Sequence, residues 1–167
     1  GLQMLDRAYK AQEIGADGIM VAPALTGFTL IRDLARDPEF HLPIFLHPCF
    51  SGSLDLSEDS GMSPFCYYGQ LSRLIADAAI FTSFGGRFSF SVDTCQKICE
   101  GTSEMMGGLR SIFPVPSGGM RWQLFKNMYQ TYGPDTIFLV GGALQTEGPD
   151  LTDNVKFFLE KLEEAQR

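Results

Sequence analysis

The chain has 167 residues, of which 44% are hydrophobic, and this is enough for the core of one domain over residues 1–167. Thirteen Lys and Arg residues against 20 Asp and Glu residues give a net charge of −7, and this acidic balance argues against a nucleic-acid partner. The sequence contains neither a run of 18 apolar residues nor a signal-peptide pattern. We therefore expect no membrane span and an intracellular, soluble protein of the cytoplasm or an organelle.

Helical and strand patterns alternate along the chain. A helix pattern is already under way at residue 2 and continues to residue 14 without a preceding capping box, so we expect that Gly1 is not a natural chain start. Short apolar runs then predict five strands, at 18–21, 43–46, 78–81, 112–116 and 137–140. Between and after them, amphipathic segments predict helices at 28–35, 65–76, 91–106 and 120–132, and one that begins at Asp150 or Thr152.

This alternation, with about 30 residues per unit, indicates an α/β fold with a parallel sheet and right-handed crossovers. A complete (β/α)8 barrel needs about 250 residues. The predicted fold is therefore a partial (β/α)8 (TIM) barrel of about five βα units. An open doubly wound sheet is the alternative, but the first predicted strand lacks the GxGxxG turn that would favour a nucleotide-binding fold.

Two glycine pairs follow the last two predicted strands. Ser117, Gly118 and Gly119 come after one strand, and Gly141 and Gly142 come after the next. Without side chains, the backbone N–H groups at such positions approach anions closely, and the last two units of (β/α)8 barrels bind phosphate in this way. The sequence thus predicts half of a phosphate site on each loop. The alternative is that both pairs only close tight turns.

His47 ends the second predicted strand, where the catalytic groups of barrels gather. A neutral imidazole at this position would transfer protons near pH 7, whereas the alternative is a hydrogen-bonded structural histidine. His41 lies in the preceding loop, and we assign it no role.

The four cysteines form no CxxC pair. Cys95 and Cys99 lie four residues apart on a predicted helix, a spacing that allows metal binding but more often fills a core face. Buried thiols in a reducing compartment are the expectation.

Four stretches of the sequence, residues 20–53, 61–91, 114–120 and 138–148, carry a resemblance to a known family. They include PVPSGGM and FLVGGALQTEG, and they resemble the C-terminal half of the large subunit of ribulose bisphosphate carboxylase (RuBisCO). More closely, the chain resembles the RuBisCO-like proteins, the form IV branch of that superfamily. The resemblance extends from the helix before barrel strand 4 to the helix after strand 8.

The resemblance implies roles for residues at three strand ends. His47 matches the strand 5 histidine that faces the reacting carbons in the carboxylase. The strand 7 motif that contacts substrate and the strand 8 amides that hold a phosphate match Ser117, Gly118, Gly119, Gly141 and Gly142.

The chain also departs from the carboxylases. Their strand 5 arginine and strand 6 histidine, which grip a second phosphate, are replaced by Pro48 and by Ile80 or Phe81. Their loop 6 lysine is missing from the glycine-rich segment around Arg87, a residue that would neutralise a substrate anion or would simply lie on the surface. These differences argue against carboxylation of a bisphosphate and favour a substrate with a single anionic end.

The family's Mg²⁺ ligands, a carbamylated lysine with Asp and Glu, lie on strand 2, and a further catalytic lysine lies on strand 1. Both strands would precede Gly1. The acidic neighbours Asp55, Glu58 and Asp59 lie in a polar loop and are interpreted as a solvated turn. The complete family enzyme would therefore use Mg²⁺, whereas we expect none to be bound by this chain alone.

These observations favour the phosphate-binding half of an enolase- or isomerase-type enzyme that acts on a phosphorylated sugar-like compound, such as a thiomethyl ketopentose phosphate. Such a half would not be competent alone. The alternatives are a non-catalytic structural subunit of a larger assembly and a sheet that binds an anion without turning it over. In each case the open sheet edges need cover, from an N-terminal half-barrel chain or a homo-oligomer partner.

Overall fold

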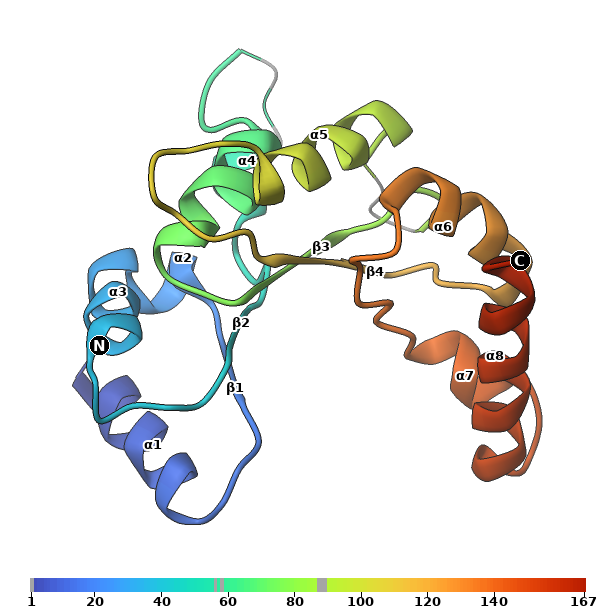
Figure 1. Ribbon diagram of the computed structural model, residues 1–167, viewed down its shortest axis with the longest axis horizontal. Helices are drawn as coiled ribbons and strands as arrows, with labels where there is room; N and C mark the ends of the chain where they lie inside the picture. Colours follow the sequence, from blue (N-terminus) through green and yellow to red (C-terminus); the bar gives the residue numbers. More distant parts are fainter. Residues whose placement is uncertain (1, 56, 58, 87–89) are drawn as a thin grey trace.

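The structure is a computed structural model that describes residues 2–55, 57, 59–86 and 90–167 (Figure 1). Four parallel strands form one sheet in the order β1-β2-β3-β4. They are β1 (Ile19–Val21), β2 (Ile44–Leu46), β3 (Ala78–Thr82) and β4 (Phe113–Ser117). The predicted α/β fold with a parallel sheet is confirmed.

The longer helices form an arc along one face of the sheet (Figure 1). They are α1 (Leu2–Glu13), α3 (Phe28–Arg36), α5 (Val92–Ser103), α6 (Phe125–Tyr132) and α8 (Leu151–Ala165). Shorter helices lie in the connections, and these are α2 (Pro23–Thr26), α4 (Gly52–Asp55), η3 (Trp122–Leu124) and α7 (Gly142–Thr146). The single helix predicted at 65–76 is instead a π-helix, η1 (Phe65–Gln70), followed by a 3-10 helix, η2 (Leu71–Leu74). Within the described chain, no helix combines the length and apolar character needed to cross a membrane.

The fifth predicted strand, 137–140, forms only an isolated parallel bridge between Leu139 and Ser117. Its amides donate to β4, from Ile137 to the Pro114 carbonyl at 3.1 Å and from Leu139 to the Pro116 carbonyl at 3.2 Å. The backbone polar groups of the odd-numbered β4 residues point towards β3: the Phe113 N–H, for example, donates to the Asp77 carbonyl. Alternation therefore directs residues 114 and 116 towards segment 137–140, and because both are proline, β4 returns no N–H to it. The prediction of a full strand was wrong for this reason.

Two helix starts match the sequence. Ser91 Oγ accepts a hydrogen bond from Thr94 N–H at 3.1 Å and caps α5. Asp150 Oδ1 accepts from the N–H groups of Thr152 and Asp153 and caps α8. The carboxylate at the start of α8 also interacts favourably with the helix dipole.

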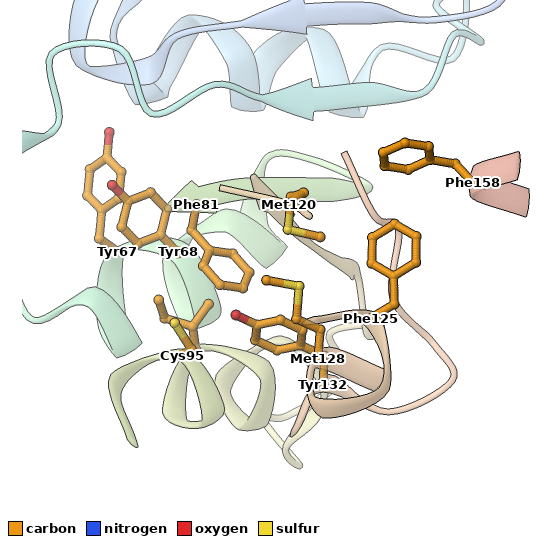
Figure 2. Packing of buried hydrophobic residues seen from close by; sticks show 10 residues of the cluster. Tyr67, Tyr68, Phe81, Cys95, Met120, Phe125, Met128, Tyr132 and Phe158 are labelled. Carbon is orange, nitrogen blue, oxygen red and sulfur yellow. The ribbon is translucent and has the colours of Figure 1, made fainter. Parts of the chain in front are cut away.

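The main core lies between the sheet and helices η1, α5, α6 and α8 (Figure 2). It is rich in aromatic side chains, and Phe81 of β3 packs edge-to-face against Tyr132 of α6 with ring centroids 5.9 Å apart. Residues on the other face of the sheet form a smaller cluster of Ala78, Ile80 and Val115. In the described chain, no helix covers this inner face (Figure 1).

The loop at 51–63 is less solvated than its sequence predicts. Asp55 is only 6% exposed, and its Oδ2 accepts a hydrogen bond from Tyr68 Oη at 2.6 Å. Because the Tyr68 proton goes to Asp55, Tyr68 Oη accepts from Ser51 Oγ at 2.6 Å, and the Pro48 carbonyl oxygen lies 2.8 Å from the same Ser51 hydroxyl. The interpretation of Asp55 as part of a solvated turn was wrong, because a tyrosine from η1 reaches under the loop. Asp59 is exposed, and Glu58 lies outside the described residues.

Candidate functional site

A hollow of about 750 Å³ opens at the carboxyl ends of β2 and β4. We call it the glycine hollow; its lining includes all the described residues that the sequence predicts for the site, namely His47, Ser117, Gly118, Gly119, Gly141 and Gly142. These residues come from three loops that are up to 95 positions apart, His47 to Gly142, yet they share one surface. Arg87, the remaining predicted site residue, lies outside the described residues.

The four glycines offer free backbone donors to the hollow. Among the described residues, no hydrogen bond uses the N–H groups of Gly118, Gly119, Gly141 or Gly142. Gly118 and Gly119 have φ angles of 76° and 68°, a conformation that glycine adopts without strain. N–H groups of successive residues at a turn suit an anion.

The two glycine pairs differ in the structural reason for glycine at each position. A Cβ on Gly119 would lie 2.5 Å from the Gly86 Cα, so close backbone packing explains this glycine. A Cβ on Gly141 or Gly142 would meet no heavy atom within 4 Å, and neither residue has a positive φ. Turn geometry and packing thus account for the first pair but not the second. The second pair leaves open space at the wall of the hollow.

Ser117 is positioned by hydrogen bonds at the end of β4. Its hydroxyl donates to the Phe81 carbonyl at 2.9 Å, and its own carbonyl accepts from Ser83 N–H at 2.8 Å. Because the hydroxyl proton is already used, Ser117 Oγ offers an acceptor rather than a donor to the hollow. The glycine amides are therefore the donors on this side.

His47 is exposed at the mouth of the glycine hollow. Its backbone N–H donates to the Val21 carbonyl at 2.7 Å, which fixes the end of β2 beside β1. Its Nδ1 accepts from Cys49 N–H at 3.1 Å. An Nδ1 that accepts a hydrogen bond carries no proton, so the neutral ring has its proton on Nε2. This local bond orients the imidazole and leaves Nε2 for a ligand.

Arg121 also lines the hollow, and the sequence analysis did not single it out. Arg121 is exposed and lies two positions after Gly119, in the loop that follows β4. It forms no ion pair with a described carboxylate. Arg121 adds a cation to the lining of the hollow, which also includes the acidic Glu147. Nothing in the sequence distinguishes it from an ordinary surface arginine.

Trp122, the only tryptophan of the chain, is a further part of the lining. Its ring packs edge-to-face on Phe157 of α8 with centroids 5.5 Å apart, and the Lys161 ammonium lies 5.8 Å from its centroid. This packing joins the wall of the hollow to α8.

No three His, Cys, Asp or Glu side chains lie close enough together to hold a metal ion in the described part of the chain. Burial raises the pKa of the Cys95 thiol and raises that of Cys99 to about 12, so both thiols are protonated at neutral pH. They pack in the core beside Tyr132, as the simpler interpretation of their spacing predicts. The described residues do not fit a Mg²⁺ site, and we derive no step through a metal.

Comparisons with known proteins identify relatives of the chain. The chain is 37% identical to 5-methylthioribulose-1-phosphate isomerase of Rhodospirillum rubrum, over 94% of its own length and 40% of the relative. It is 32% identical to 2,3-diketo-5-methylthiopentyl-1-phosphate enolase of Geobacillus kaustophilus, over 83% of its length and 34% of the relative. No protein-family model matches the chain.

Among solved structures, a RuBisCO-like protein from Alicyclobacillus acidocaldarius superposes with a TM-score of 0.88 at 28% identity, covering 96% of this chain and 41% of that one. The chain thus spans about two fifths of the length of the relatives that it matches, which is consistent with the C-terminal half of their barrel. The four parallel strands and their covering helices agree with part of such a barrel. The chain is therefore homologous, in sequence and in structure, to part of the RuBisCO-like proteins.

Proposed function

We propose that this chain is the phosphate-binding part of an enolase- or isomerase-type enzyme that acts on a phosphorylated, sugar-like substrate. The observation that carries the proposal is the glycine hollow, where glycines of two loops, whose N–H groups have no hydrogen-bond partner among the described residues, line the same space as His47 and Arg121. Support comes from the relatives, which are named 5-methylthioribulose-1-phosphate isomerase and 2,3-diketo-5-methylthiopentyl-1-phosphate enolase. By analogy, a 2,3-diketo- or ribulose-type 1-phosphate is the proposed substrate class.

In this proposal each residue has a chemical task. The amides of Gly118, Gly119, Gly141 and Gly142 bind the phosphate oxygens, and Arg121 balances their charge. His47 Nε2 holds or transfers the proton that moves during enolisation, because an imidazole is effective near pH 7. The hydrogen bond from Cys49 keeps that nitrogen directed away from its own backbone.

The remaining machinery would come from outside these residues. Enolisation needs stabilisation of an oxyanion, which Mg²⁺ supplies when it is bound in the complete enzyme. We propose that its ligands, and the cover for the open sheet edges, come from an N-terminal half-barrel. The alternative, a structural subunit without catalysis, is favoured only if no such half accompanies the chain.

The test uses the protein purified from its source, with every chain of the assembly identified. Trp122 lines the glycine hollow, so its fluorescence reports a ligand there. We expect inorganic phosphate to change this fluorescence, and we expect Gly141→Val to weaken phosphate binding at least about tenfold because a side chain would occupy the ligand's place. Gly108→Val is the matched control for the fluorescence titration, since its Cβ also meets no heavy atom within 4 Å but Gly108 does not line the glycine hollow.

His47→Gln should leave phosphate binding unchanged and lower kcat on a methylthio-ribulose or diketo 1-phosphate by about 10²- to 10⁴-fold. Equal phosphate affinities in Gly141→Val and the parent would refute the phosphate site. Phosphate binding without turnover, in an assembly that holds no strand-end lysine with an Asp-Glu pair, would instead favour the structural subunit.

A further inference from the structure

A second hollow lies at the opposite end of the sheet, where β2, β3 and β4 begin. We call it the amino-end hollow; its volume is about 500 Å³. Arg36 and His41 line it from the connection between α3 and β2, Arg73 and Asp77 from η2 and the turn before β3, and Arg110 from the loop before β4. All three connections belong to this chain, so the hollow needs no partner to form.

Positive charge is concentrated in the amino-end hollow. Its lining holds three arginines, and the ion pairs of the described residues involve none of them. Asp77 is the one acidic residue of the lining, and its Oδ2 already accepts a hydrogen bond from Ile44 N–H at 2.9 Å. A chain of net charge −7 thus places three unpaired guanidinium groups around one space.

Arg73 is the buried member of the set, at 7% exposure. Its guanidinium donates to the carbonyls of Glu104, Leu109 and Arg110 at 2.7, 2.9 and 3.0 Å. These carbonyls belong to the C-terminal end of α5 and the loop after it, which favour a cation, and no described carboxylate forms an ion pair with Arg73. The same bonds fix the loop that carries Arg110, which holds that residue at the hollow.

We propose that the amino-end hollow binds a small polyvalent anion of phosphate or carboxylate chemistry. Arg36 and Arg110 contact the anion from the rim, and Arg73 supplies charge from beneath. Barrel enzymes carry out their chemistry at the carboxyl ends of the strands, so an anion at the amino ends is an effector or stabiliser and not the substrate. The site is independent of the proposed function, because it shares no residue with the glycine hollow.

The experiment is calorimetric titration of the purified protein, in the assembly that it forms, with inorganic phosphate and separately with citrate at constant ionic strength. The parent is compared with Arg36→Gln/Arg110→Gln, a double variant of two exposed residues. The control is Arg7→Gln/Lys126→Gln, which removes the same charge from exposed residues outside both the amino-end hollow and the glycine hollow. Arg73 is left intact because its hydrogen bonds support the fold.

We expect a binding event distinct from the one that changes Trp122 fluorescence, and we expect it to be weakened at least about tenfold in Arg36→Gln/Arg110→Gln. The control should bind as the parent does. Preference between phosphate and citrate identifies the class of anion. Equal anion binding in the parent and in Arg36→Gln/Arg110→Gln would overturn the proposal, whether or not phosphate also binds in the glycine hollow.

Discussion

The adjacent residues Tyr67 and Tyr68 of η1 are both buried, yet their hydroxyl groups have opposite surroundings. Tyr68 Oη bonds to Asp55 and Ser51, whereas Tyr67 Oη has no hydrogen-bond partner among the described residues. Removing a buried donor from a carboxylate leaves that carboxylate unsatisfied, whereas removing an unpartnered hydroxyl leaves nothing unsatisfied. The pair therefore offers a matched test.

We expect Tyr68→Phe to lower the free energy of unfolding by about 1–3 kcal/mol, because Asp55 loses its buried donor. Tyr67→Phe, at the neighbouring position, should be neutral or slightly stabilising. The measurement is the urea midpoint of each variant at unchanged slope. Similar losses in both variants would show that the Asp55 contact does not contribute as described.

Alkaline pH should destabilise the fold through Cys99 and Tyr67. Desolvation raises the pKa of Cys99 from 9.0 to about 12 and that of Tyr67 from 10.0 to about 12. The unfolded chain then releases these protons at lower pH than the folded chain, so the stability they contribute is complete below pH 9 and is lost as pH rises towards 12. In Cys99→Ala the decline between pH 9 and 10 should be shallower, as measured by urea unfolding at each pH. An unchanged decline would contradict this assignment.

At this scale the sequence predicted where His47, Ser117 and the glycines lie but not what Asp55 does. Strand ends can be located from local apolar runs, and parallel strands bring their ends together. The burial of Asp55 depends on Tyr68, which lies 13 residues further along the chain. Within the polar loop, nothing in the local sequence distinguishes Asp55 from its solvent-exposed polar neighbours.

Helix packing shows a second kind of close approach, between η1 and α5. A Cβ on Gly101 of α5 would lie 3.0 Å from the Gly69 Cα, and one on Gly69 would lie 2.8 Å from the Gly101 Cα. The two backbones therefore touch, and only glycine fits at the crossing. This contact places α5 over the core that Cys95 and Ile98 help to fill.

Gly101→Ala should cost about 1–3 kcal/mol through overpacking, even though alanine favours a helix more than glycine does. Gly108→Ala, at a site with open space around the added carbon, should change stability by less than about 0.5 kcal/mol. Thermal unfolding followed by circular dichroism measures both. A stabilised Gly101→Ala would mean that helix propensity outweighs the contact.

Most elements could be predicted because strands and helices differ in the period of their apolar residues. The period did not distinguish an α-helix from the π- and 3-10 turns at 65–74, which share nearly the same spacing. Nor did an apolar run at 137–140 reveal that its neighbour would place prolines towards it. Whether the prolines of β4 lie opposite this run depends on which β4 residues point their backbone groups away from β3. The pairing of the strands determines this, and the local sequence does not reveal it.

At the scale of the molecule, the inner face of the sheet carries exposed apolar side chains. Met20 of β1 is 55% exposed, Phe113 of β4 is 49% exposed and Leu139 is 40% exposed. Strand register places Met20 beside Phe45, which packs on the inner cluster, so Met20 lies on the same face. A complete barrel would cover this face.

If a partner half-barrel covers the β1 edge, Met20 should be protected from peroxide oxidation in the assembly purified from source. It should be oxidised when residues 1–167 are prepared alone. Met105, at 97% exposure on the loop after α5, is the internal control and should be oxidised in both preparations. Peptide mass spectrometry gives the ratio, and equal oxidation of Met20 in the two preparations would exclude cover at this edge.

The one-sided pairing of β4 with segment 137–140 has a consequence for motion. Segment 137–140 donates hydrogen bonds to β4 but receives none from it, so this pair of strands has about half the backbone hydrogen bonds of an ordinary parallel pair. The free amides of the glycine hollow lie on both sides of this boundary, Gly118 and Gly119 on one and Gly141 and Gly142 on the other. An anion bound by both glycine pairs would hold segment 137–140 against β4. We therefore expect hydrogen exchange of the Ile137 and Leu139 amides in deuterated water to slow when the ligand is bound.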